Sequence, residues 1–247
     1  MTYCNRLYTL LTSLGLGVDV LRFGDDISRY KLVVLPTPFL MNDGFKSTLR
    51  DYVYNGGTVI STFLTAVKDS YNVVPGEVLP SGLTDLFGIH VTEYEPVFSG
   101  TEASIVLDTA IKNKGTNQLW TEVIESCGAD IIGRYESTFR RGEAVISRNR
   151  YGAGHAYYLG TDLDDKTLLA FLETVISRVS LRRAPVQGPR GVEVLTRYHQ
   201  DDPMYFIFNF TMQPVTIEIG SERINMLTGD VICGQQTIGE KSYLVIR

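Results

Sequence analysis

The strongest constraint on the fold is a continuous apolar run, Leu32 to Leu35, which lies between two helical patterns. A run of this kind predicts a strand buried on both faces, as in a parallel sheet. Apolar spacing predicts helices over 3–14 and 44–55, and a β-branched segment predicts a second strand over 58–62. Helices and strands that alternate with short connections indicate an α/β fold, here a doubly wound, flavodoxin-like layer.

The middle of the chain predicts a mixture of shorter elements. A glycine turn at 151–154 joins two β-patterned segments, 143–148 and 155–160, into an antiparallel pair. Inward-facing leucines and valines predict an amphipathic helix over 164–179. Strands are also expected at 18–21, 105–107 and 131–132, and a short helix at 84–87.

A break in the pattern follows this helix. The segment from Arg182 to Pro189 has the composition of a linker, and only strand patterns follow it. We therefore expect a first domain over 1–183, a linker over 184–189 and a small antiparallel β-sandwich domain over 190–247. The strands of this second domain are expected at 192–197, 205–210, 215–219, 223–226 and 243–246.

Composition excludes several classes of protein. The chain has 247 residues, a net charge of -5 and 21% charged residues, so it lacks the basic excess that nucleic-acid binding needs. Its apolar runs are too short for a membrane span, and its start does not resemble a secretory signal. Cys4, Cys127 and Cys233 are far apart and odd in number, which predicts neither a metal site nor a disulfide framework. We expect a cytoplasmic protein.

Several short motifs could carry chemistry, but each has a simpler interpretation. Gly152 and Gly154 lack the third glycine of a nucleotide-binding loop, and a hairpin turn explains them. Asp162, Asp164 and Asp165 could bind calcium, yet capping of the next helix by Thr161, Asp162 or Asp164 is the plainer reading. The histidines lack a paired nucleophile or carboxylate, so no acid–base role is assigned to them; they are His90, His155 and His199.

Two further patterns invite comparison with hydrolases. Glu93 and Glu95 alternate on an expected strand and face one side. Glycosidases use a pair of carboxylates, but two glutamates this close in sequence are common on plain surfaces. A nucleophile elbow would follow the strand 58–62, but no cysteine or flanking glycine is present there, and Ser61 lies inside the strand. We therefore predict no catalytic, cofactor-binding or metal-binding residue.

A set of motifs in a fixed order runs along nearly the whole chain. Its parts are 18–20, 28–36, 52–58, 79–80, 86–93, 147–152, 156–161, 191–194, 206–211 and 226–229. Their order and spacing resemble the trimerisation domain and the small C-terminal β domain of glycoside hydrolase family 42 β-galactosidases. The resemblance implies a first domain with a fold like class I glutamine amidotransferases, without the catalytic cysteine, that holds three subunits together.

The resemblance also implies where catalysis takes place. Family members cleave terminal β-D-galactosides with retention, through two glutamates of an N-terminal TIM barrel that is absent here, so no catalytic residue carries over. The chain also starts after the family's usual first strand. We expect either an altered strand order or a neighbouring chain that covers the gap; an ordinary five-stranded sheet built from 1–180 would contradict this.

Two alternatives remain open. One is a stand-alone amidotransferase-like hydrolase, which the missing elbow disfavours. The other is a carbohydrate-binding module that stacks sugars on aromatic residues of the β domain, although most of these residues alternate as core positions should. The aromatic residues concerned are Tyr198, Tyr205, Phe206, Phe208, Phe210 and Tyr243.

Overall fold

A computed structural model describes residues 2–108, 114–186, 188–189, 191–200 and 202–247. The chain divides into two compact units. The central unit comprises Leu21–Val179, and the terminal unit combines Met1–Val20 with Ser180–Arg247. Gln187 of the expected linker and Arg190 of the expected β domain lie outside the described residues.

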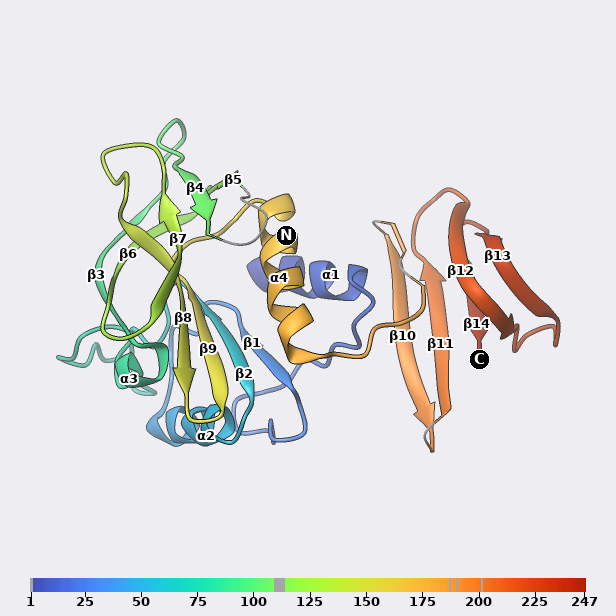
Figure 1. The fold of residues 1–247 in the computed structure, drawn as a ribbon, viewed down its shortest axis with the longest axis horizontal. Helices are drawn as coiled ribbons and strands as arrows, with labels where there is room; N and C mark the ends of the chain where they lie inside the picture. The colour runs from blue at the N-terminus through green and yellow to red at the C-terminus, as the bar shows by residue number, and fades with distance from the viewer. Residues whose placement is uncertain (1, 109–113, 187, 190, 201) are drawn as a thin grey trace. The chain divides into compact units, whose positions relative to one another are not determined.

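Three parallel strands form the base of the central unit (Figure 1). They are β1 (Leu32–Leu35), β2 (Thr58–Thr62) and β9 (Gly154–Leu159), with β2 in the middle. Helix α2 (Asp43–Tyr54) connects β1 to β2. Its N-cap is Asn42, whose side-chain oxygen accepts the backbone N–H of Phe45 at 2.7 Å.

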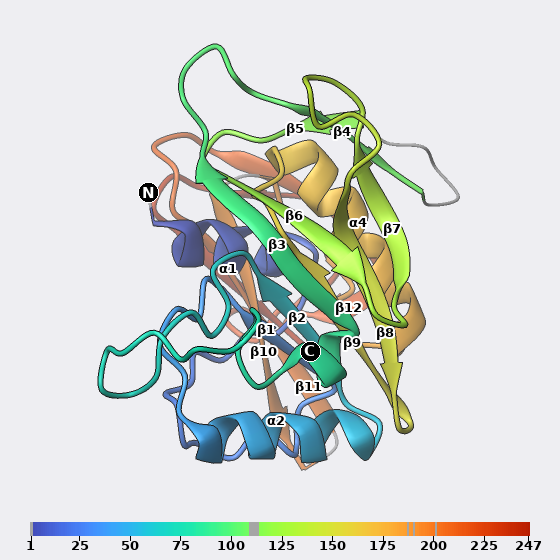
Figure 2. The same cartoon turned by 90° about the vertical axis from the view of Figure 1, so that its left-hand side faces the viewer.

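Antiparallel strands extend this base into a branched sheet. The sheet order is β1-β2-β9-β8-β7-β4-β5, and β6 attaches to β8 and carries β3 (Figure 2). The added strands are β3 (Ile89–Pro96), β4 (Ser104–Leu107), β5 (Lys114–Thr116), β6 (Trp120–Ser126), β7 (Asp130–Tyr135) and β8 (Ala144–Tyr151). The fold is thus a mixed α/β fold in which the parallel strands are a minority.

Two more helices belong to the central unit. The single turn α3 (Thr84–Phe87) ends at Gly88, whose φ of 62° is the left-handed conformation that glycine adopts readily. Helix α4 (Asp165–Val179) buries one apolar face, as its spacing predicts. The core of the unit joins fully buried residues from α2, α3 and the strands; they include Leu49, Val53, Val59, Leu86, Phe87, Ile89 and Ala156.

The terminal unit joins the first helix to the last strands. Helix α1 (Tyr3–Ser13) is tied to β10 by Tyr8, whose hydroxyl donates to the carboxylate of Glu193 at 2.6 Å. An antiparallel sheet β10-β11-β14 and a ribbon β12-β13 share an apolar core that includes Val194, Ile207 and Ile219. The strands are β10 (Val192–His199), β11 (Asp202–Asn209), β12 (Val215–Ile224), β13 (Val231–Ile238) and β14 (Tyr243–Ile246).

Some sequence-based expectations are wrong. Residues 18–21 form no strand, and Val20 is 76% exposed. Within the described residues β1 pairs only with β2 and forms an edge of the sheet, so it is less buried than its composition predicts. The strands expected at 215–219 and 223–226 are one strand, β12, with a register shift between Ile219 and Arg223. The sequence pattern predicts a strand at Glu93 and Glu95, within β3, but it predicts none of β5, β6 and β13.

None of the helices in the described part of the chain combines the length and the apolar composition needed to cross a lipid bilayer.

The close approach of the β8–β9 hairpin to α2 predicts an intolerant glycine. A Cβ at Gly154 would overlap the backbone carbonyl oxygens of Val53 and Gly57, which cannot move independently. We expect Gly154→Ala to lower the free energy of unfolding by about 3 kcal/mol, at the upper end of overpacking effects. Urea unfolding followed by the fluorescence of the single tryptophan, Trp120, measures this. Gly76→Ala, where no described atom lies within 4 Å, is the matched control; equal effects of both would contradict the prediction.

Candidate functional site

Ligands of open α/β sheets bind at the carboxyl ends of the parallel strands, so this edge is the first place to look for a site. Here β2 ends at Thr62 and turns sharply, with Leu64 at a φ of 62°. Positive φ is unusual for leucine and marks a strained turn. Ser61 lies inside β2, is fully buried and shares a hydrogen bond with Thr65 at 2.7 Å, so it is not on an elbow.

A glutamate from the antiparallel part of the sheet fills this edge. Glu122 of β6 is only 2% exposed. One carboxylate oxygen accepts the backbone N–H of Leu64 at 2.8 Å, and the other accepts the hydroxyl of Tyr158 on β9, also at 2.8 Å. The hydroxyl of Tyr135 donates to the backbone carbonyl of Glu122 at 2.9 Å. The place where a substrate would bind in a related fold is therefore occupied by the protein's own side chain.

Burial changes the protonation of this network. Desolvation raises the pKa of Glu122 to about 7, although the N–H of Leu64 and the hydroxyl of Tyr158 oppose the shift by stabilising the carboxylate. Burial and the neighbouring carboxylate raise the pKa of Tyr158 well above its usual value, so it remains a hydrogen-bond donor. The arrangement offers a buried acid whose two oxygens both accept hydrogen bonds from the protein itself.

A second carboxylate organises the approach to β6. Asp162 is 2% exposed and accepts the consecutive backbone N–H groups of 118–120, the shortest at 2.8 Å from Leu119. Thr161 donates its hydroxyl to the carbonyl of Trp120 at 2.6 Å. These bonds hold β6 in register with the end of β9, and with it the carboxylate of Glu122.

Asp164 is the residue that caps the helix after β9. Its carboxylate accepts the N–H of Thr167 at 3.0 Å and the N–H of Thr116 at 2.9 Å. Of the three residues proposed as caps, Asp164 takes this role, whereas Thr161 and Asp162 bind the 118–120 segment instead. Within the described ranges, no group of three or more His, Cys, Asp or Glu side chains could hold a metal ion.

The other candidate motifs do not converge on a site. Gly152 lies in the tight β8–β9 turn at a φ of 60°, as the hairpin interpretation predicts. His155 lies on β9, and burial and then Arg148, Arg150 and Arg178 lower its pKa. His90 lies on β3 and His199 ends β10, so the three histidines are on separate strands.

Glu93 and Glu95 have a partner that the sequence did not reveal. Both bind Arg140, a guanidinium 6% exposed, at 3.1 and 2.8 Å, and Glu143 binds it at 3.1 Å. Burial disfavours the charge of Arg140, but the three carboxylates outweigh this and raise its pKa further above its usual range. The pair is therefore an anchor for an arginine and does not have the free geometry of glycosidase carboxylates.

The arginine lies beside a shallow cleft of about 400 Å³. The cleft is open to solvent and is lined by the loops 96–103 and 138–140 together with Glu95 and Thr121. Two phenyl rings, Phe98 and Phe139, belong to its lining.

The aromatic residues of the terminal unit divide between the two faces of β11. Tyr205 points into the core, whereas Phe208 and Phe210 lie on the other face and stack at 5.9 Å. Tyr243 of β14 is paired with Phe208, 6.1 Å away. The periodicity therefore predicts a core position for Tyr205 and fails for Phe210, which is 54% exposed.

Known proteins are similar to this chain over most of its length. The sequence profile of the family described as the β-galactosidase trimerisation domain matches residues 2–182. The β-galactosidase BgaA of Planococcus sp. is 27% identical over 98% of this chain and 36% of its own length. The β-galactosidase BgaA of Clostridium cellulovorans is 30% identical over 82% of this chain and 30% of its own length.

Solved structures give the same assignment. The β-galactosidase from Bacillus circulans sp. alkalophilus superposes with a TM-score of 0.91 over all of this chain and 37% of its own, at 24% identity. Gan42B, a family 42 β-galactosidase from G. stearothermophilus, superposes with a TM-score of 0.88 over 98% of this chain and 35% of its own, at 25% identity.

This mixed sheet with its filled strand ends belongs to a class of assembly domains found in glycoside hydrolases. In particular, the chain belongs to the β-galactosidase trimerisation domain family, as its motifs indicate. It spans about a third of the length of the curated relatives that it matches.

The raised pKa of Glu122 predicts a pH-dependent stability. Its pKa is about 7 in the folded chain against an ordinary 4.5, so the folded state binds the proton more tightly. Its contribution is greatest below pH 4.5 and is lost as the pH rises to 7, about 3 kcal/mol in total. Glu122→Gln abolishes this loss, so the difference in unfolding free energy between variant and wild type should grow in favour of the variant over this range.

Urea unfolding at a series of pH values between 4 and 8 measures this difference. Glu125→Gln, an exposed residue of the same strand, is the matched control and should follow the wild type. Parallel pH profiles for the wild type and Glu122→Gln would show that folding does not raise the pKa of this carboxylate.

Proposed function

We propose that this chain is the assembly module of a β-galactosidase and holds three subunits together. The observation that carries the proposal is the match of residues 2–182 to the trimerisation domain family. The filled edge supports it, because Glu122 and Tyr158 occupy the place where an enzyme of this layout would bind a substrate. A self-contained hydrolase is disfavoured by the same residues.

The enzyme to which the module belongs would hydrolyse terminal β-D-galactosides. The relatives that support this are β-galactosidases by name, and each is about three times as long as the matched region. The catalytic glutamates would then lie outside this chain, which has no residue that we assign to catalysis.

Finer features of the family follow as part of the proposal. The first domain, 1–183, would have the doubly wound layer of class I glutamine amidotransferases; the α2 connection between parallel β1 and β2 supports this. The segment 184–189 would be the linker and 190–247 the small β domain. Three exposed free thiols, Cys4, Cys127 and Cys233, favour a reducing, cytoplasmic compartment.

Sedimentation velocity of the purified chain tests the assembly role. We expect a species of three times the 27.6 kDa of one chain at micromolar concentration. A monomer at every concentration up to the solubility limit would contradict self-assembly.

Hydrolysis of a chromogenic β-galactoside tests the absence of catalysis. We expect no turnover by the chain alone. Turnover that disappears on replacing Glu122, Glu93 or Glu95 by glutamine would show that the chain carries an active site of its own.

A further inference from the structure

The loop between β7 and β8 holds an aromatic ring in solvent at an energetic cost. Thr138, a β-branched residue, adopts a φ of 67°, a conformation that costs on the order of 1–3 kcal/mol. The next residue, Phe139, is 82% exposed. Neither the strain nor the exposed ring stabilises the folded chain by itself. Strained backbone is common in loops that bind a partner.

The ring is also fixed in place. The guanidinium of Arg140 lies 4.8 Å from the centroid of the Phe139 ring, and Arg140 itself is locked by its three glutamates. Because these contacts restrict the loop before any partner arrives, little ordering entropy is lost on binding. Phe139 therefore has the properties of a rigid binding anchor.

A second ring completes the surface. Phe98, 67% exposed, lines the same cleft as Phe139 and Arg140. Aromatic residues and arginine at the centre, with a polar rim, make up the usual composition of protein–protein hot spots. We name this surface the Phe139 face; it consists of Phe98, Phe139 and the rim carboxylates Glu93, Glu95, Glu102 and Glu143.

The Phe139 face is acidic. Glu93, Glu95 and Glu143 each keep a third or more of their side chain exposed although all three share the single charge of Arg140. Glu102, on the adjoining loop, is exposed as well, and the exposed Arg141 of the Phe139 loop offsets one of these carboxylates. A partner must therefore present basic groups to this face.

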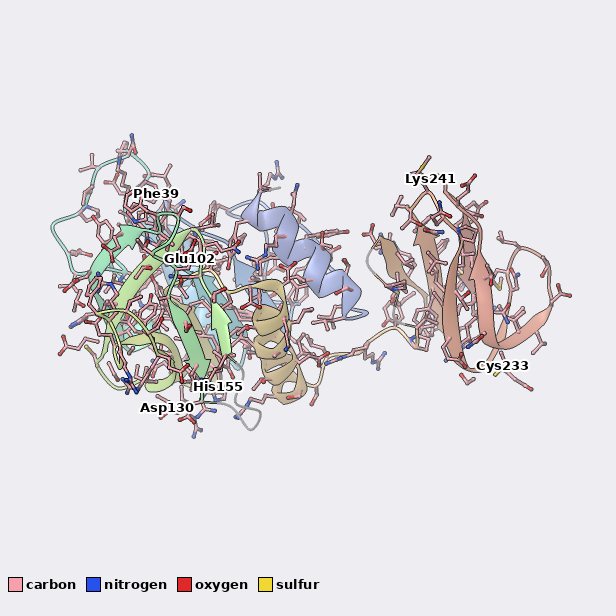
Figure 3. The ribbon with its side chains drawn as sticks, turned by 90° about the horizontal axis from the view of Figure 1, so that it is seen from above. Phe39, Glu102, Asp130, His155, Cys233 and Lys241 are labelled. Carbon is pink, nitrogen blue, oxygen red and sulfur yellow. The ribbon has the colours of Figure 1, made fainter. Side chains whose placement is uncertain are left out.

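The same unit carries a basic surface elsewhere. Arg150 pairs with His155 across the β8–β9 hairpin, and the charges of Arg148 and Arg178 also act on this histidine. Asp130 binds Arg148 at 2.6 Å. We name these four basic residues the His155 face. Figure 3 shows Glu102 and His155 well apart, so the two faces are distinct surfaces of one unit.

We infer that the Phe139 face of one copy binds the His155 face of a second copy. The inference rests on the proposed assembly role and names the surfaces that would carry it. A cyclic trimer is built from heterologous contacts, in which two different patches of the same chain meet, and opposite charges on those patches favour that pairing over like-with-like contacts. The exposed rings supply the apolar centre of the contact.

Replacement of the anchor tests this first. In sedimentation velocity, Phe139→Ser should raise the dissociation constant about tenfold or more, as loss of a hot-spot residue does. Tyr71→Ser is the matched control, since Tyr71 is 85% exposed in the same unit but lies on neither face. The far-ultraviolet circular dichroism spectrum of both variants should equal that of the wild type, which shows that the fold is intact.

Charge reversal tests the pairing of the two faces. Glu102→Lys and Arg150→Glu should each weaken assembly, and the double variant should recover most of the loss. High salt should weaken wild-type assembly and should have less effect on the single variants. A double variant no better than the singles would overturn the pairing.

The outcomes separate the two levels of proposal. A wild-type chain that stays monomeric refutes the assembly role itself. A wild-type trimer that Phe139→Ser and Glu102→Lys leave unchanged refutes only the placement of the interface and leaves the assembly role intact.

Discussion

The hydrogen bonds of the Glu122 carboxylate determine how the two halves of the central sheet fit together. Glu122 comes from an antiparallel strand, yet its oxygens bind the turn after β2 and the tyrosine of β9. The free-energy cost of burying a carboxylate is much smaller when hydrogen-bond donors bind it. Loss of either donor, the Leu64 N–H or the Tyr158 hydroxyl, would therefore destabilise the whole network. These bonds cover the carboxyl ends of the parallel strands, including the strained turn at Leu64. An edge that binds ligands in related folds therefore has a structural role here.

Arg140 plays a comparable part at the other polar cluster, with a different result. A buried cation surrounded by carboxylates stabilises little over an apolar core, but it fixes geometry. Here it fixes the loop 136–143 to strand β3 and keeps a phenyl ring in water. The Glu122 cluster thus holds the interior of the unit together, whereas the Arg140 cluster fixes a surface loop that can contact a partner.

The sequence predicts local features well and long-range partners poorly. The apolar run of β1, the cap of α2 and the β8–β9 hairpin follow from spacing and from glycine and asparagine chemistry. The same reasoning places Glu93 and Glu95 on one face, but it cannot find Arg140, which lies 45 residues beyond Glu95 in the chain. The burial of Glu122 could not be predicted for a related reason. A glutamate in a strand is expected to face solvent, and Glu122 is buried only because β6 joins a branched sheet. Residues 18–21 show the converse: they have β propensity, but they do not pair with the open edge of β1.

The discontinuity of the terminal unit has a consequence for synthesis. Tyr8 is made before its partner Glu193, which is 185 residues further along the chain. At about 5–20 residues per second, α1 waits roughly ten to forty seconds for the strands on which it packs. During that time its row of leucines, Leu7, Leu10 and Leu11, is exposed to whatever else is in the cell. A chaperone that shields these leucines is therefore useful until β10 and the strands paired with it have been made.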